Sequence, residues 1–486
     1  MHRWSMARAV MAFALAWAPV AHAATDADIA QLRDEIRQLK ESYETRVQAL
    51  EARVKEAEAA VNRAEQAREA VPVAAAAVPP ASTAAGAEPP PPSQTAASSD
   101  VAAARGAPAS SANAFNPAIS AVLTGVYSNL SQDPNRYALS GFALGDDVSP
   151  GRRGLGVGES EFTLAANVDH LFAGSLTVAL TPENTVSVEE AYGLVTALGN
   201  GLAPKFGRFF SGIGYQNEQH QHAWDFYDAP LAYQAFLGGQ YSTDGLQLKW
   251  LAPTDEFVEL GAELGNGDSF PGSERNRNGI GAASVFAHVG GDVGTSHSWR
   301  AGLSYLDTRA DGRETTQFDA AGNLARNGFS GRSRIAAADF VWKYAPNGNA
   351  QQTNFKVQAE YFWRREHGDL TYDTDGAFGL PQTDAYSSSQ SGGYLQGVWQ
   401  FMPLWRVGAR YDRLNPGAPD YGANAAFLAV PEFHPQRYTF MVDWTPSEFS
   451  RLRLQYARNQ VRPDVIDSEW FLQYILTLGA HGAHRF

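Results

Sequence analysis

Apolar and polar side chains alternate along most of the chain after residue 114. The segment 436–444 is a clear case, because one face of an extended strand would carry Tyr438, Phe440, Val442 and Trp444 and the other Arg437, Thr439, Met441 and Asp443. The same period of two recurs in 354–363, 451–457 and 256–265. Successive side chains of a β-strand point to opposite faces, so this pattern predicts strands that each have one apolar face.

Two kinds of connection alternate between these strands. Short connections rich in aromatic residues and proline lie near 250–257, 342–346, 401–405 and 444–449, whereas long polar connections lie near 266–281, 307–333, 365–391 and 414–435. A soluble β-sandwich would also alternate in polarity. Short turns on one side, long loops on the other and aromatic residues at strand ends are typical of a transmembrane β-barrel. The predicted fold class is therefore all-β, an antiparallel transmembrane barrel.

About sixteen strands are predicted in this barrel. They lie near 118–130, 159–169, 171–181, 185–197, 203–210, 245–252, 256–265, 281–290, 297–306, 333–344, 353–364, 392–401, 404–413, 436–445, 449–459 and 468–480. An even number places both ends of the barrel on the same, periplasmic side of the membrane. Barrels of this size leave an aqueous lumen.

Three segments precede the predicted barrel, which takes residues 114–486. Residues 1–23 combine a basic start, a short apolar run and a small-x-small end, which is typical of a secretory signal peptide. Residues 24–70 contain no Gly or Pro and repeat apolar residues with 3-4 spacing. This predicts a periplasmic α-helical coiled coil, with a single solvated helix as the alternative. Residues 71–113 are mostly Ala, Pro and Ser, which predicts a disordered linker.

The composition excludes several classes of function. The chain has no Cys, so disulfides, thiolate nucleophiles and thiolate metal sites are excluded. Its 38 Lys and Arg against 52 Asp and Glu give a net charge of −14, and this acidic excess argues against nucleic acid as a partner. Neither a G-x-S-x-G nor an H-E-x-x-H motif occurs, so an enzyme is not expected.

The connection 211–244 is unusually aromatic for a solvated loop, which suggests that it packs against other parts of the protein. Residues 114–486 resemble a bacterial outer-membrane porin and are broadly similar to the phosphate-selective porins. A terminal Phe486 on the last amphipathic strand resembles the recognition signal of outer-membrane proteins, although His484 departs from it. By the strand count, 211–244 is the third external loop, and the resemblance implies that this loop folds into the barrel and narrows the pore.

A second resemblance rests on three short segments. Residues 115–120, 207–215 and 478–486 resemble a proteobacterial group labelled zinc-regulated TonB-dependent outer-membrane receptors. Plugged transporters of the TonB type have about 22 strands, and a globular plug would have to precede the barrel. Residues 24–113 have the composition of a coiled coil and a linker, so an open porin is favoured over an energised receptor.

Alternation also assigns charged side chains to the lumen. The early strands supply Glu159, Glu161, Glu259 and Glu263, joined by Glu189 or Glu190, and the late strands supply Arg406, Arg410, Arg437, Arg451 and Arg453. The loop acids Glu218, Asp225 and Asp228 would face this arginine wall across a constriction, and the transverse field would order water and exclude apolar solutes. The alternative is that these charges pair with their neighbours and stabilise a wet lumen.

The charge balance bears on selectivity and the histidines on metals. Residues 114–486 hold 27 Lys and Arg against 39 Asp and Glu, a net charge of −12, which favours cations or neutral solutes over phosphate. His220 and His222, with Glu218 and Asp225 nearby, offer imidazole and carboxylate ligands suited to Zn²⁺. Two histidines one residue apart are also often ordinary hydrogen-bonded residues. The sequence predicts no required cofactor and leaves Zn²⁺ at His220 and His222 as a hypothesis.

The predicted function is an outer-membrane porin of a Gram-negative bacterium. It would form a water-filled channel for passive diffusion of small hydrophilic solutes or ions, with zinc or another cation as one candidate. The expected partners are outer-membrane lipids, the other copies in a homotrimer, and periplasmic or cell-wall material in contact with 24–70. The alternatives are a structural tether that links the outer membrane to the cell wall through the coiled coil, and a closed outer-membrane receptor.

Overall fold

The computed structural model describes residues 117–145, 148–182, 184–428 and 432–479. The predictions for 1–23, 24–70 and 71–113, and for the terminal Phe486, concern residues outside this part of the chain. Within the described residues, no helix is long and apolar enough to cross a membrane.

Strands make up most of the described chain. They are β1 (Ala118–Leu130), β2 (Gly154–Val157), β3 (Ser160–Asn167), β4 (Phe172–Leu180), β5 (Val186–Val195), β6 (Leu202–Phe210), β7 (Ser242–Leu251), β8 (Phe257–Gly265), β9 (Ala282–Val293), β10 (His297–Phe318), β11 (Leu324–Tyr344), β12 (Asn354–Tyr372), β13 (Gln382–Met402), β14 (Trp405–Asn415), β15 (Gln436–Ser447), β16 (Ser450–Arg462) and β17 (Val465–Gly479). The helical elements are short: η1 (Pro134–Arg136), η2 (Gln221–Ala223), α3 (Leu231–Leu237), η3 (Pro346–Gly348) and η4 (Gly422–Ala426).

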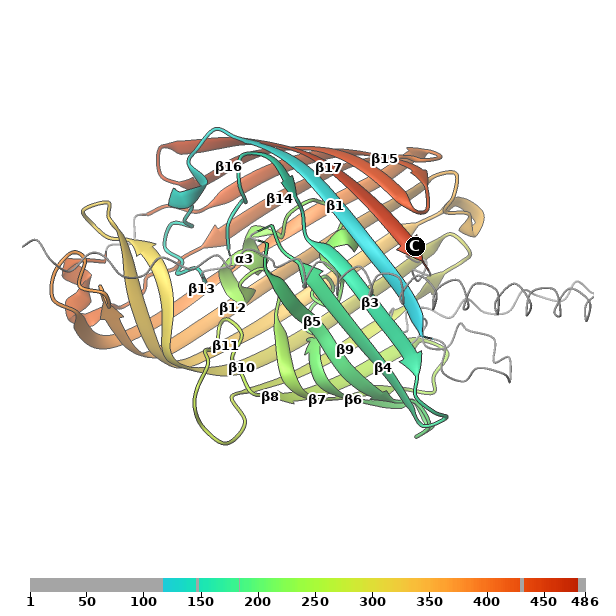
Figure 1. Cartoon of the computed structure of the whole chain (residues 1–486), viewed down its shortest axis with the longest axis horizontal. Helices are drawn as coiled ribbons and strands as arrows, with labels where there is room; N and C mark the ends of the chain where they lie inside the picture. The colour runs from blue at the N-terminus through green and yellow to red at the C-terminus, as the bar shows by residue number, and fades with distance from the viewer. Residues whose placement is uncertain (1–116, 146–147, 183, 429–431, 480–486) are drawn as a thin grey trace, which may run out of the picture. The chain divides into compact units, whose positions relative to one another are not determined.

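The strands form one closed antiparallel barrel (Figure 1). Each strand pairs with its neighbours in the chain, and β1 closes the ring by pairing with β17, from Ser120 opposite Gly479 to Leu130 opposite Glu469. Both β2 and β3 pair with β1, so they are two parts of one barrel strand. The barrel therefore has sixteen strands, and the predicted fold class and strand count are confirmed.

The barrel is apolar outside and polar inside. In β15 the outward Tyr438 and Phe440 are 41% and 55% exposed, whereas the inward Arg437 and Asp443 are 2% and 0% exposed. A soluble protein would bury the aromatic face and expose the charged one. The reversed distribution fits a surface that lies against lipid and an interior that holds polar groups.

Aromatic rings form two girdles on the outer surface. At the end with the short turns they include the pairs Trp342–Phe355, Trp399–Phe401 and Trp405–Trp444, and nearer the other end the pairs Tyr361–Trp363, Tyr411–Tyr438 and Tyr456–Trp470. Trp405 and Tyr411 are six positions apart in the sequence, and Phe355 and Trp363 are eight positions apart. These spacings correspond to about 20–26 Å along a strand, which for a strand tilted by about 40° is about 15–20 Å along the barrel axis, within the ~25 Å apolar band of outer-membrane barrels.

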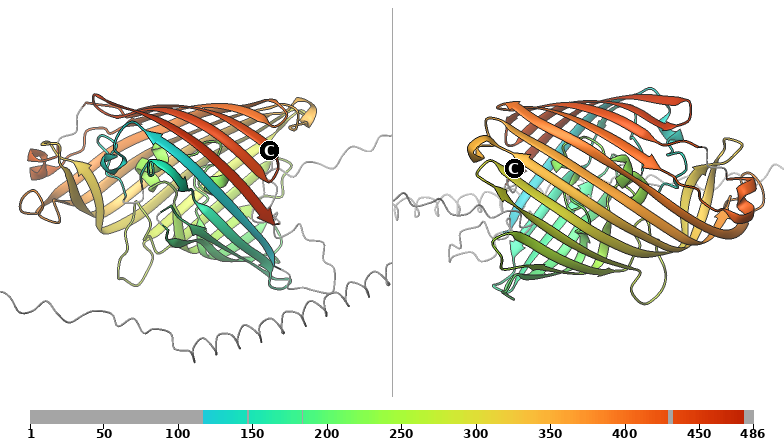
Figure 2. Two further views of the ribbon diagram at one scale, coloured as in Figure 1. Left: turned by 45° about the horizontal axis from the view of Figure 1, so that its top comes forward. Right: turned by 180° about the vertical axis from the view of Figure 1, so that it is seen from behind.

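Four neighbouring strands are longer than the sequence predicted. The strands β10 to β13 have 22, 21, 19 and 21 residues and project beyond the rest of the barrel at the long-loop end (Figure 2). The prediction of polar loops over 307–333 and 365–391 is therefore wrong for most of those residues. Past the apolar band both faces of these strands are largely polar, so the alternation that marks a membrane strand disappears although the backbone pairing continues.

Gly207 allows β5 and β6 to approach closely. Its φ is 121°, and a Cβ atom there would lie 2.2 Å from the carbonyl oxygen of Ala191 on β5. We expect Gly207→Ala to lower the free energy of unfolding by about 1–3 kcal/mol because of backbone strain, measured by urea titration of protein folded in lipid vesicles. Gly125→Ala is the matched control, since no described atom lies within 4 Å of its Cβ position. Equal losses in the two variants would contradict the strain argument.

Candidate functional site

Residues 211–241, which connect β6 to β7, lie inside the barrel and are called the inner segment below. Their short helix α3 is buried throughout. Main-chain N–H groups of the inner segment donate to the side chains of three well-separated strands: Gly212 to Glu263 on β8 (2.9 Å), Leu231 to Asp412 on β14 (2.9 Å) and Tyr227 to Gln455 on β16 (2.8 Å). The segment thus reaches across the lumen and is fastened on both sides of it.

Asn217 closes the base of the inner segment. Its side-chain Nδ2 donates to the carbonyl oxygens of Ser211 and Tyr241 (both 2.8 Å), and its Oδ1 accepts from the N–H of Tyr241 (2.8 Å). Because Asn217 is fully buried, these bonds satisfy main-chain groups that would otherwise be unpaired in the barrel interior. The two ends of the segment are therefore held together at the point where they leave the strands.

An apolar core surrounds α3 inside the barrel. The rings of Tyr233 and Phe236 pack against Phe362 on β12, with centroid distances of 5.3 and 6.0 Å, and Phe236 also contacts Phe142 (5.7 Å). The sequence prediction did not include this core. The sequence feature that could have indicated this core is Phe362, an aromatic residue on the otherwise polar face of its strand.

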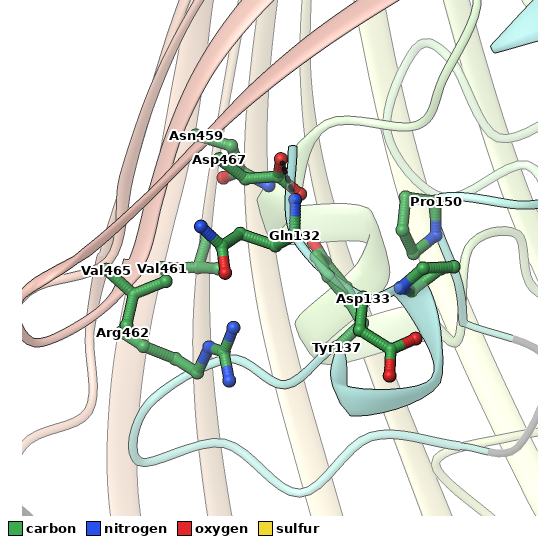
Figure 3. Close-up of a pocket in the computed structure, with 10 residues that line it drawn as sticks. Gln132, Asp133, Tyr137, Pro150, Asn459, Val461, Arg462, Val465 and Asp467 are labelled. Atoms are coloured by element: carbon green, nitrogen blue, oxygen red, sulfur yellow. Dashed lines mark hydrogen bonds between the residues drawn. The ribbon is translucent and has the colours of Figure 1, made fainter. Parts of the chain in front are cut away.

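The connection after β1 also packs into the barrel. Tyr137 donates from its hydroxyl to Oε1 of Gln234 in α3 (2.7 Å), and Gln390 on β13 donates to the carbonyl oxygen of Gly141 (2.7 Å). Figure 3 shows where this connection meets β16 and β17, with Gln132 beside Asp467, whose Oδ1 accepts from the Gln132 N–H at 2.9 Å. The recess there has a volume of about 10 Å³, room for about one water.

The two later acids of the inner segment face the arginines of the late strands. Asp225 accepts from Nη1 of Arg406 (3.3 Å) and forms an ion pair with Lys356. Asp228 accepts from Nη2 of Arg410 (3.0 Å) and forms an ion pair with Arg437. Both of these acids of the inner segment therefore contact arginines of the late strands.

The arginine wall also carries its own acids. Asp443 accepts from Nε of Arg453 (2.8 Å) and Nη2 of Arg406 (2.5 Å). Further pairs join Arg437 to Glu469 (2.6 Å) and Arg410 to Asp412 (3.0 Å), and Arg451 lies 4.0 Å from Asp443. The arginines therefore lie beside acids of their own wall. This arrangement agrees better with the alternative, in which lumen charges pair with their neighbours, than with a lumen that has acids on one side and bases on the other.

Glu218 does not face the arginines. It forms an ion pair with Lys249 on β7, across the barrel from them, so the expectation for this residue is wrong. The other early acids also have partners close by. Glu259 lies 3.0 Å from Nδ1 of His288, and Glu263 accepts from Ser211 Oγ (2.5 Å) as well as from Gln247. Sequence spacing could not reveal these partners, because they come from different strands.

His220 and His222 meet the remaining early acids. Nδ1 of His220 lies 3.1 Å from Oε2 of both Glu161 and Glu189, and its Nε2 lies 3.1 Å from Oε2 of Glu190. Nδ1 of His222 lies 2.7 Å from Oε1 of Glu161. The carboxylates that surround the two imidazoles are therefore strand residues, not Glu218 and Asp225 as their sequence spacing suggested.

A β-bulge brings both Glu189 and Glu190 to His220. In the pairing of β4 with β5, Thr177 faces Glu190 and Val178 faces Val188, so Glu189 is an extra residue without a partner. A bulge redirects side chains that strict alternation would send to opposite faces. The alternation in the sequence assigned only one of the two glutamates to the lumen, whereas in the structure both contact His220. Glu159, at the break between β2 and β3, lies against Glu189.

The acids around His220 control its charge. Burial by itself would lower the pKa of His220, but the charge of Glu161 and hydrogen bonds to Glu161, Glu189 and Glu190 raise it well above its usual value. The carboxylates therefore favour a positive charge at the position of this imidazole.

Basic side chains gather in the lumen near the short-turn end. Five of them, each partly exposed, come from separate strands: Arg300, Lys343, Lys356, Arg406 and Arg451. The ring of Tyr215 in the inner segment lies 5.2 Å from the guanidinium of Arg300. Burial would raise the pKa of Tyr215, but Lys343, Lys356 and Arg300 lower it below its usual value. Two members of this group, Lys356 and Arg406, form ion pairs with Asp225, so part of the positive charge at this end of the lumen is neutralised.

The fold and the lumen define a transmembrane β-barrel of the outer-membrane type. No protein-family model matches the chain. An uncharacterized protein of Aquifex aeolicus (strain VF5) is 30% identical over 359 residues, which cover 69% of this chain and 71% of that protein. The chain belongs to the same family as this Aquifex protein.

Several outer-membrane proteins of known structure resemble the barrel. A loop-deletion mutant of OmpT from Vibrio cholerae covers 75% of this chain and 99% of its own, with 11% identity and a TM-score of 0.46. The outer-membrane channel DcaP of Acinetobacter baumannii covers 75% and 97%, with 13% identity and a TM-score of 0.44. An anion-selective porin from Comamonas acidovorans covers 75% and 99%, with 10% identity and a TM-score of 0.44. Similarity at this level carries no inference about substrates.

Proposed function

We propose that the chain forms a water-filled channel in the outer membrane, through which small hydrophilic solutes or ions diffuse passively. The observation that carries the proposal is the charged lumen wall, with Arg406, Arg410, Arg437 and Arg453 on the inner faces of strands whose outer faces are apolar. A polar interior behind an apolar exterior is typical of a barrel that carries water. Pore diameter and lining charge would then select the solute.

The inner segment would narrow this channel. Support comes from its attachment to β8, β14 and β16, which places it across the lumen, and from the ion pairs of Asp225 and Asp228 with the arginine wall. The short-turn end would face the periplasm, as in outer-membrane barrels generally. A homotrimer, and contact of 24–70 with the cell wall, remain parts of this proposal.

Uptake of zinc or another cation is a narrower form of the proposal, supported by the imidazoles and carboxylates around His220. The described residues add no support for the tether or the closed receptor. No enzymatic role is proposed, since the charged groups of the lumen pair with one another in an extended network.

The channel proposal predicts single-channel conductance steps when the purified full chain is added to a planar lipid bilayer. Steps in groups of three would support the trimer, and the reversal potential in a salt gradient would report ion selectivity. Protein heated in denaturant before addition is the control, because it lacks the barrel. A folded barrel that never conducts would overturn the proposal and favour a closed receptor or a tether.

A further inference from the structure

The strongest cluster of metal-ligating groups in the described residues lies where the inner segment meets β3 and β5. One ligand atom each from Glu161, Glu189 and His220 lie within 4.8 Å of one another. Glu161 belongs to β3, Glu189 to the bulge in β5 and His220 to the inner segment, so three separate parts of the chain converge on one point. Glu190 and His222 complete the surroundings.

The distances within the cluster fit a small divalent cation. Nδ1 of His220 lies 3.1 Å from a carboxylate oxygen of Glu161 and 3.1 Å from one of Glu189. Ligand atoms placed 2.0–2.1 Å from a tetrahedral Zn²⁺ are about 3.3 Å apart. The two carboxylate oxygens lie within 4.8 Å of each other, so they would move together by at most about 1.5 Å for the three atoms to coordinate one ion.

Neighbouring side chains contact His220 and Glu161 in the way that orients metal ligands in known sites. Nε2 of His220 lies 3.1 Å from Glu190, so with Nδ1 on a metal the other ring nitrogen would donate to a carboxylate. Metal-ligating histidines almost always have such a partner, which fixes the ring and its tautomer. His222 holds the second oxygen of Glu161 at 2.7 Å, which leaves the first oxygen for the ion.

The charges also favour a cation. Three acidic side chains, Glu161, Glu189 and Glu190, contact only two imidazoles, so the carboxylates in contact outnumber the rings by one. Arg451 reaches this group through the carbonyl oxygen of His222 at 3.3 Å. Like charges that are buried together repel one another strongly in a medium of low dielectric constant, and a divalent ion would remove the excess.

We propose that Glu161, Glu189 and His220 bind a divalent transition-metal cation, which fastens the inner segment to β3 and β5. A mixed set of one imidazole and two carboxylates suits Zn²⁺ better than Mg²⁺ or Ca²⁺, which prefer oxygen ligands alone. Binding of the ion does not depend on the proposed channel function. Its effect on conductance does rest on that function, because a fastened inner segment would hold the lumen in one width.

The test is equilibrium dialysis of the folded full chain in detergent micelles against Zn²⁺, with metal content measured by mass spectrometry. We expect one ion per chain, no saturable binding in His220→Ala or Glu189→Gln, and affinity about 10–100-fold weaker in Glu190→Gln. His288→Ala is the matched control, since His288 also pairs with a buried glutamate, Glu259, but lies outside the cluster. Heat-dependent mobility in gels verifies that each variant is folded.

The outcomes separate the two proposals. Folded wild-type protein that binds no Zn²⁺, that binds it equally well in His220→Ala, or that binds Mg²⁺ as tightly would overturn the metal site. Zn²⁺ that changes the conductance of the wild type and not of His220→Ala would support the fastening of the inner segment. Protein that binds Zn²⁺ and never conducts would retain the site and overturn only the channel.

Discussion

Replacement of Asp443 by Ala is expected to lower the free energy of unfolding by about 3–5 kcal/mol, the range for removal of one partner from a buried ion pair. Asp443 is 0% exposed and accepts hydrogen bonds from Arg453 and Arg406. Without it, the 1% exposed Arg453 would lose its hydrogen-bonded carboxylate and remain buried beside Arg406, which would still pair with Asp225. The measurement is urea-induced unfolding of protein folded in lipid vesicles, followed by tryptophan fluorescence.

An exposed ion pair supplies the control for this prediction. Asp311 lies 3.0 Å from Arg277, and their side chains are 49% and 69% exposed. Asp311→Ala should cost less than about 1 kcal/mol, because solvent screens such pairs. If Asp443→Ala cost no more than Asp311→Ala, water would already solvate the arginine wall, and the ion pairs of the lumen would contribute little to stability.

Removal of the inner segment is expected to increase single-channel conductance severalfold. The sharpest variant replaces residues 219–238 with a short Gly-Ser linker and keeps Asn217, whose bonds to Ser211 and Tyr241 hold the base together. Arg406, Arg410 and Arg437 would lose their partners Asp225 and Asp228 but would gain water in the wider lumen. The measurement is conductance in planar bilayers at fixed salt concentration.

A deletion outside the lumen is the matched control for this variant. Residues 375–380 form the exposed turn between β12 and β13, and their removal should leave conductance unchanged. Equal conductance in the wild type and the inner-segment variant would show that the limiting part of the pathway lies elsewhere, for example at the connection 131–145 that packs on α3. The narrowing role proposed for the inner segment would then be wrong.

The strands of the barrel could be predicted from the sequence because their signal is local. Lipid outside and polar groups inside impose a period of two on every strand, as in 436–444. The bounds of β1 match the prediction, and most of the other strands agree with it within a few residues. The prediction of the strand ends failed for β10 to β13, which continue beyond the apolar band. There lipid contacts neither face of the strands, so the sequence no longer alternates between apolar and polar residues.

The partners of the candidate site could be predicted only in part. Alternation placed Glu161 and the arginines in the lumen, and the aromatic character of 211–244 indicated that it packs against other parts of the protein. The sequence could not show that Glu218 pairs with Lys249 or that both Glu189 and Glu190 contact His220. Nor could it show that Tyr233 and Phe236 of α3 pack on Phe362.

The sequence by itself determined the class of fold, the number of strands and the side of each strand that faces lipid, because these follow from side chains two residues apart. The tertiary structure alone decided which charges meet inside the barrel. Glu161, Glu189 and His220 come together because β4 pairs with both β3 and β5, β5 contains a bulge and the inner segment folds inward. The inward fold of the segment depends on contacts between residues far apart in the chain, such as Leu231 with Asp412, which no local pattern encodes.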